Sequence, residues 1–123
     1  FNTIKNIIED YKKIYDLIII NTSSECFFKL NKKLIKLSDE SIFITGTSML
    51  EIKKSKTLLK IYIFEWGIEK EKINIVLNKY NIYSIDEKII SNIFKTYKIA
   101  GKIKYANNNK ILINENLLQK LNI

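Results

Sequence analysis

Short apolar runs alternate with segments of helical periodicity along the 123 residues of this chain. The first run, within residues 15–21, contains Leu17, Ile18, Ile19 and Ile20 in unbroken succession. Such a short, β-branched run without alternation is typical of a strand buried on both faces of a parallel sheet. Comparable runs predict three further strands, over residues 41–45, 73–77 and 99–105.

The segments between these runs place apolar residues three and four positions apart, which is the spacing of amphipathic helices. Ser48 with Glu51 and Ser84 with Glu87 have the Ser-x-x-Glu spacing of a capping box, so each serine is expected to start a helix. Gly67 is placed to end the longer of these two helices. The predicted helices span residues 1–13, about 25–37, about 48–65, and a segment after Ser84 with Ile85, Ile89, Ile93 and Tyr97 on one side.

This alternation of helices and strands predicts an α/β fold with a mostly parallel sheet and right-handed crossovers. The length and the 46% of hydrophobic residues fit one domain, residues 1–123, with three layers and helices on both faces of the sheet. The last segment, 110–121, leaves two structures open. Ile113, Leu117 and Leu121 suit a helix, whereas residues 110–113 could pair back as a strand.

The formal net charge of +8 raises the question of anionic partners. Most of the lysines in two clusters are interleaved with apolar helical positions, which is the pattern of a solvated outer helix face. No recognition-helix, RNP or single-strand-binding motif accompanies them, so no specific nucleic-acid partner is expected. The two clusters are Lys29, Lys32, Lys33 and Lys36, and Lys53, Lys54, Lys56 and Lys60.

Residues that commonly carry catalysis are sparse. The chain has no histidine to act as a base for its single cysteine, Cys26, which is therefore interpreted as a small core residue of a protein from a reducing cytoplasm. The acidic residues form neither carboxylate pairs nor a cluster with cysteine, so no catalytic or metal-binding residue is assigned. No apolar run approaches the ~18–20 residues of a membrane span, and no secretory signal is present, so a cytoplasmic location is expected.

Four segments, in this order, resemble motifs of the C-terminal half of ParA/MinD-type P-loop ATPases, with the CpaE/TadZ-like branch as the nearest. They are YDLIIINT at 15–22, DESIFIT at 39–45, IVLNK at 75–79 and GKIKY at 101–105. In that family the first is the Walker B strand, the third ends in an asparagine that contacts adenine, and the fourth flanks the base. The resemblance covers nearly the whole chain and implies a Rossmann-like half of a P-loop NTPase. By this resemblance the cofactor-binding residues are Asn21, Thr22, Asn78, Lys79 and Tyr105.

These polar residues also have purely structural interpretations. Asn21 and Thr22 could cap the helix that begins near Ser24. Asn78 could hydrogen-bond only the turn that follows its strand, and Lys79 could simply face solvent.

Departures from the family pattern bear on activity. The chain contains no glycine-rich Walker A loop, which in the family supplies the backbone N–H groups and lysines for the phosphates. The Walker B aspartate position holds Asn21, which lacks the charge that helps to hold Mg²⁺. Lys104 and Ala106 replace the usual proline and aspartate of the fourth motif. ATP and Mg²⁺ are the cofactors of the full-length family, so this chain is expected to bind nucleotide weakly or not at all and not to hydrolyse it.

The resemblance implies the C-terminal portion, or a degenerate member, of an ATPase that positions pilus, secretion, flagellar, plasmid or division machinery as a dimer. The P-loop portion would then lie upstream of Phe1, and the chain would either self-associate or lack its N-terminal half. The alternative is a non-enzymatic Rossmann-like module that docks to a protein or an anionic surface through its basic helix faces.

Overall fold

The computed structural model describes residues 2–23 and 29–105, which form two compact units. The N-terminal unit spans Phe1–Leu37, and the sheet unit spans Ser38–Ile123. Cys26 and the segment 110–121, whose structure the sequence leaves open, lie outside the described residues.

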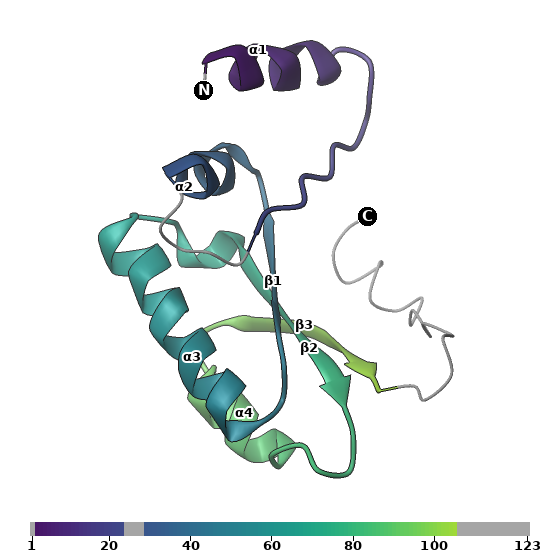
Figure 1. The fold of residues 1–123 in the computed structure, drawn as a ribbon, viewed down its shortest axis with the longest axis vertical. Helices are drawn as coiled ribbons and strands as arrows, with labels where there is room; N and C mark the ends of the chain where they lie inside the picture. The colour runs from purple at the N-terminus through teal and green to yellow at the C-terminus, as the bar shows by residue number, and fades with distance from the viewer. Residues whose placement is uncertain (1, 24–28, 106–123) are drawn as a thin grey trace. The chain divides into compact units, whose positions relative to one another are not determined.

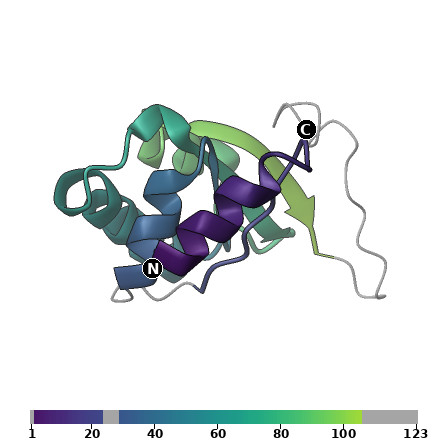
Figure 2. The same cartoon turned by 90° about the horizontal axis from the view of Figure 1, so that it is seen from above.

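The N-terminal unit contains two helices, α1 (Asn2–Tyr11) and α2 (Lys29–Leu37). Helix α1 is followed by an extended stretch of chain (Figures 1 and 2). The Tyr11 and Tyr15 rings meet edge to face across the end of α1, with centroids 5.6 Å apart. Helix α1 confirms the expected N-terminal helix, although none of its residues is buried.

The strand predicted over residues 15–21 is wrong for the described structure. These residues take part in no sheet, and the Ile19 side chain is 78% exposed. An apolar run becomes a strand only when a neighbouring strand pairs with its backbone N–H and C=O groups. Residues 15–21 have no such partner among the described residues.

Within its described residues, the sheet unit contains three parallel strands in the order β1-β2-β3. Strand β1 (Ser41–Thr45) pairs in register with β2 (Ile73–Tyr80), which pairs on its other side with β3 (Lys98–Lys104). The register of β2 with β3 shifts twice, between Ile75 and Val76 and between Leu77 and Tyr80. These strands confirm the three predicted after residue 40, and the parallel α/β class with them.

One face of the sheet packs against helix α3 (Met49–Lys60). The Phe43 ring meets the Tyr62 ring edge to face at 5.8 Å, and the hydroxyls of Thr45 and Ser55 are 2.5 Å apart. Because side chains alternate along a strand, Ile75 and Leu77, the β2 partners of Phe43 and Thr45, lie on this same face. We call it the helix-covered face.

The helical segment made of α3 and the turn that follows it begins and ends where its sequence predicts. Ser48 is the N-cap, and its side chain and that of Glu51 form a reciprocal capping box. After a π-helical turn, η1 (Ile61–Glu65), Gly67 adopts a left-handed φ of 66°, a conformation that glycine takes without a Cβ penalty. Trp66 stacks on Tyr62 with centroids 4.6 Å apart and is buried, as expected for a packing residue.

Helix α4 (Glu87–Ile93) departs from its prediction in two respects. Its N-cap is Asp86, which accepts a hydrogen bond from the Lys88 N–H, so the predicted capping box of Ser84 with Glu87 is wrong. Its buried residues are Ile90 and the following Phe94, both fully buried, whereas Ile89, on the predicted apolar side, is 47% exposed.

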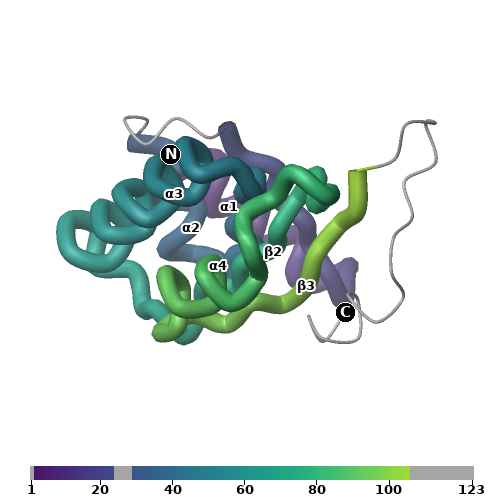
Figure 3. Tube along the Cα trace, turned by 90° about the horizontal axis from the view of Figure 1, so that it is seen from below, coloured from purple at the N-terminus to yellow at the C-terminus, as the bar shows by residue number. Residues whose placement is uncertain are grey.

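Helices α3 and α4 lie on the same side of the sheet (Figures 1 and 3). This follows from topology, because two successive right-handed crossovers that move in the same direction place both helices on one face. The opposite face, which we call the second face, carries Ile42, Ile44 and Val76. Val76 forms a small apolar cluster there with Ala100 and Ile103. Within residues 38–105 no helix covers this second face.

Candidate functional site

A shallow depression lies where the carboxyl ends of the three strands meet. Its volume is about 230 Å³, below the roughly 300–1,000 Å³ of typical ligand pockets. Ligands of open parallel sheets bind at this edge, because the loops that follow the strands converge there. The lining residues are Thr47, Ser48 and Glu51 after β1, Lys79, Asn81, Tyr83 and Ser84 at and after the end of β2, and Tyr105 after β3.

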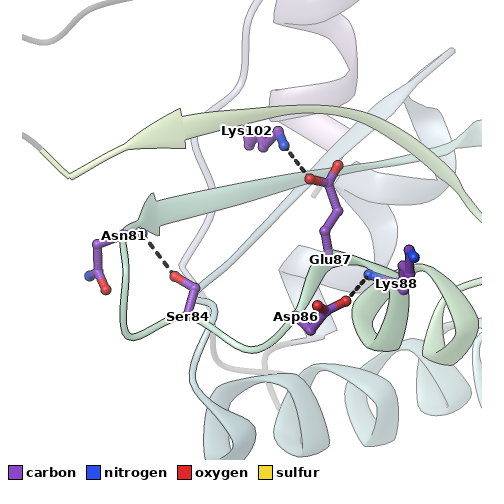
Figure 4. Close-up of polar contacts among 6 residues, drawn as sticks. All are labelled: Asn81, Ser84, Asp86, Glu87, Lys88 and Lys102. Carbon is purple, nitrogen blue, oxygen red and sulfur yellow. Dashed lines mark hydrogen bonds and ion pairs between the residues drawn. The ribbon is translucent and has the colours of Figure 1, made fainter.

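A hydroxyl pair joins the loop after β1 to the loop after β2. The Thr47 and Ser84 hydroxyl oxygens are 2.7 Å apart, and the Ile85 N–H donates to the Thr47 carbonyl at 3.1 Å. Ser84 also accepts a hydrogen bond from the Asn81 N–H at 2.8 Å (Figure 4). Thr47 is buried, so this network fixes the floor of the depression rather than leaving free hydroxyls there.

The carboxylate of the depression belongs to Glu51, and the helix cap already uses it. It accepts hydrogen bonds from the Ser48 N–H at 3.1 Å and the Ser48 hydroxyl at 2.5 Å. These bonds lower the pKa of Glu51, and the positive charges of Lys79 and Lys54 lower it further. A Cβ on Gly46 would collide with this carboxylate, so the absence of a side chain at Gly46 makes room for the cap.

The lowered pKa of Glu51 predicts a pH-dependent contribution to stability. A carboxyl group whose folded pKa lies below its unfolded value of 4.5 stabilises the fold above that pH, and the contribution is lost as the pH falls through the folded pKa. Because Glu51 is exposed, we expect at most about 1 kcal/mol. Thermal melts from pH 6 down to about pH 3 should therefore show a smaller stability loss for Glu51→Gln than for the unmodified chain. Glu65→Gln, an exposed glutamate outside the cap, is the control, and equal pH profiles for both variants would contradict this role.

Strand β2 ends in an unusual backbone conformation. Lys79 has a φ of 57°, a left-handed value that costs a residue with a Cβ roughly 1–2 kcal/mol. The Asn78 side-chain oxygen accepts a hydrogen bond from the Lys79 N–H at 2.9 Å, and the Lys79 carbonyl accepts one from the Asn81 side chain at 3.1 Å. The Asn78 side chain therefore hydrogen-bonds the backbone at the end of β2, and Lys79 is exposed at the depression.

The third wall of the depression comes from the end of β3. The Tyr105 N–H donates to the Tyr80 carbonyl at 2.9 Å, which extends the pairing of β2 with β3 by one residue. Lys102 forms an ion pair with Glu87 at the start of α4 (Figure 4) and lies 4.9 Å from the centre of the Tyr80 ring. Tyr105 itself is 56% exposed, so its ring is accessible to a ligand.

The predicted cofactor-binding residues are distributed over both units. Lys79 and Tyr105 line the same depression, and Asn78 directly precedes Lys79. Asn21 and Thr22 belong to the N-terminal unit, where Asn21 is exposed and Thr22 half-buried. Near them, the buried side chain of Asn31 on α2 donates to both the carbonyl and the hydroxyl of Ser23, each at 3.0 Å.

Six residues that line the depression are not among the site residues predicted from the sequence: Thr47, Ser48, Glu51, Asn81, Tyr83 and Ser84. The spacing of Ser84 from Glu87 predicts a helix cap, and this local pattern carries no information about tertiary partners such as Thr47. Tyr83 could have been identified from the sequence as a candidate site residue, since Ile82 and Tyr83 are two large apolar residues within a polar turn. They are 89% and 88% exposed.

The described part of the chain contains no group of three or more metal-ligating side chains and no helix long and apolar enough to cross a bilayer. Comparison of the sequence with family models and with curated proteins gave no match.

Proposed function

We propose that this chain is the C-terminal portion, or a degenerate member, of a ParA/MinD/CpaE-like ATPase that positions cellular machinery such as a pilus, secretion, flagellar, plasmid or division apparatus. In this proposal the sheet belongs to a three-layer Rossmann-like fold, and the chain binds an adenine nucleotide weakly without hydrolysing it. The observation that carries the proposal is that Lys79 and Tyr105, from two separate motifs of the resemblance, line one depression at the carboxyl edge of the parallel sheet.

The depression fits the base of a nucleotide better than its phosphates. The Tyr83 and Tyr105 side chains offer aromatic surface, and the Asn81 side chain adds polar groups. A phosphate chain with Mg²⁺ needs several N–H donors and free carboxylates, whereas the Glu51 carboxylate is engaged by Ser48. The described residues therefore do not fit a Mg²⁺–triphosphate group, and we derive no chemical step through one.

Titration calorimetry of the full chain with Mg-ATP tests this proposal. We expect a dissociation constant of about 0.1–1 mM, little changed by removing Mg²⁺, and no release of phosphate. Tyr105→Ala should weaken binding by about threefold to tenfold, because base–aromatic stacking contributes about 1 kcal/mol or more. Tyr15→Ala is the matched control, since Tyr15 is equally exposed at 56% and does not line the depression.

Two results would contradict the nucleotide proposal in different ways. A micromolar affinity that depends on Mg²⁺ would mean that the chain holds the phosphates after all and that Asn21 serves in place of the family's aspartate. Absence of binding at millimolar nucleotide would remove the base site and leave the sheet as a scaffold only.

A second candidate function rests on the outer face of α3. Its four lysines, Lys53, Lys54, Lys56 and Lys60, are all exposed, as their sequence pattern predicts. A row of exposed positive charge supports the non-enzymatic alternative, in which the chain docks to a protein or an anionic surface through a basic helix face. Such docking would weaken steeply with added salt and would be independent of Tyr105, which distinguishes it from nucleotide binding.

A further inference from the structure

The loop between β2 and α4 presents two large apolar side chains to solvent. The Ser84 N–H donates to the Asn81 carbonyl at 3.0 Å, so residues 81–84 form a β-turn with Ile82 and Tyr83 at its two central positions. These side chains are 89% and 88% exposed. Gly, Pro, Asn, Asp and Ser dominate turns, so the turn itself does not account for two large apolar residues at its centre.

Hydrogen bonds fix the backbone of this turn. The Asn81 side-chain oxygen accepts from the Tyr83 N–H at 2.8 Å, and the Ser84 hydroxyl accepts from the Asn81 N–H at 2.8 Å (Figure 4). The Ser84 hydroxyl is also paired with that of Thr47, in the loop after β1. The turn is therefore anchored to the sheet unit, and it holds Ile82 and Tyr83 away from the core.

Further exposed apolar residues lie at the same edge of the sheet. The start of α3 and the loop after β2 lie at the same end of the sheet unit (Figure 1). Met49 and Leu50, in the first turn of α3, are 46% and 63% exposed, and Tyr105, after β3, is 56% exposed. We call the five residues Met49, Leu50, Ile82, Tyr83 and Tyr105 the apolar rim.

Exposed lysines outnumber carboxylates at the edge that carries the apolar rim. The lysines are Lys54, Lys79, Lys88, Lys102 and Lys104, and the carboxylates are those of Glu51, Asp86 and Glu87. Lys79 and Lys104, at the ends of β2 and β3, form no ion pair within the described residues. The edge is therefore net positive, which fits an anionic partner.

We propose that the apolar rim docks on an anionic lipid bilayer, with Ile82 and Tyr83 entering the interfacial region and Lys79 and Lys104 beside the headgroups. Tyrosine favours this region of a bilayer, and acidic headgroups attract lysine. A protein partner needs a complementary surface of about 800 Å² on each side, whereas a bilayer accommodates side chains that protrude from a turn. This proposal does not require nucleotide and uses a different surface from the lysines on the outer face of α3.

Co-sedimentation of the full chain with sucrose-loaded vesicles tests the docking. With vesicles of phosphatidylcholine and about 30% phosphatidylserine, we expect half-maximal binding at roughly 0.1–1 mM accessible lipid, the range of a single weak anchor. Phosphatidylcholine vesicles should bind at least about tenfold more weakly, and added salt should weaken binding to the mixed vesicles. Absence of binding to the mixed vesicles at about 5 mM lipid would overturn the proposal.

Ile82→Ser separates the turn from general electrostatic attraction. We expect it to raise the lipid concentration at half-binding about tenfold, because it removes one large apolar side chain from the bilayer. Phe64→Ser is the matched control, since Phe64 is 81% exposed but lies on η1, at the other end of α3. Both residues are exposed, so neither substitution should change the fold. Equal losses of binding, or no loss for Ile82→Ser, would overturn the proposal.

A pair of lysine variants tests which edge of the sheet faces the lipid. Lys104→Gln should weaken binding to the mixed vesicles about threefold to fivefold, as expected for one lysine near an anionic surface. Lys98→Gln removes the same charge from the opposite end of the same strand, where Lys98 is also exposed, and should have a clearly smaller effect. Equal effects would mean that the positive charge acts without orientation and would overturn the proposal.

Ile82 does not line the depression, so Ile82→Ser also separates this proposal from nucleotide binding. The variant should bind Mg-ATP as the unmodified chain does. In sedimentation velocity without vesicles it should also associate as the unmodified chain does. Weaker self-association of Ile82→Ser together with unchanged vesicle binding would assign the turn to a second copy and overturn the proposal.

Discussion

Phe94→Ala is expected to lower the free energy of unfolding by about 3–5 kcal/mol, as large-to-small changes of buried aromatic residues do. Phe94 is fully buried directly after α4, and its ring meets that of Tyr97 edge to face at 6.4 Å. Domains of this size are stable by only about 5–15 kcal/mol, so the variant should lose a large part of its stability. Urea denaturation followed by circular dichroism measures the loss.

Phe64→Ala is the matched control for this prediction. It removes the same side-chain atoms from a position that is 81% exposed on η1, so we expect a change below about 0.5 kcal/mol. Similar losses for the two variants would mean that the Phe94 side chain is not buried as the structure shows. An unchanged unfolding midpoint for Phe94→Ala would have the same meaning.

The full chain is expected to self-associate as its concentration rises, because β1 has a pairing partner on one side only among the described residues. Its other edge presents unpaired backbone N–H and C=O groups, and Ser41–Thr45 contains neither a charged residue nor a proline to discourage pairing. This edge is distinct from the second face of the sheet, because it is formed by the backbone of β1. Sedimentation velocity between about 10 and 300 µM should therefore show a coefficient that rises with concentration.

Ser41→Lys should raise the dissociation constant of this association about tenfold, since it places like charges at the edge of each copy. Ser91→Lys makes the same chemical change on the exposed side of α4 and is expected to leave association unchanged. A chain that remains monomeric across the whole range would show that the β1 edge is already covered.

Local sequence signals predicted much of the sheet unit correctly. Ser48 and Glu51 form their capping box, and Gly67 ends the helical segment in a left-handed conformation. The apolar runs that became β1, β2 and β3 were also located to within a few residues. These features depend on neighbours in the sequence or on strand-like apolar runs, so composition and spacing suffice to find them.

Tertiary contacts determined which of these sequence patterns form the element that they predict. The run within residues 15–21 is as apolar as β2, yet it forms no strand among the described residues, because a strand needs a paired neighbour. Ser84 has the spacing of a helix cap, but its hydroxyl pairs with Thr47, 37 residues away, and Asp86 caps α4 instead.

The residues of the candidate site also fall into two groups, those that the sequence predicts and those that only the tertiary structure identifies. Lys79 and Tyr105 are named by the resemblance of the segments 75–79 and 101–105 to family motifs, and the structure places both on one depression. Thr47, Asn81 and Ser84 joined them only through contacts between loops that follow different strands. By itself, the sequence determined the parallel α/β class, the caps of the long helix and the exposed lysines. The pairing of strands, the choice of helix start and the membership of the site required the tertiary structure, because each depends on contacts between residues far apart in the chain.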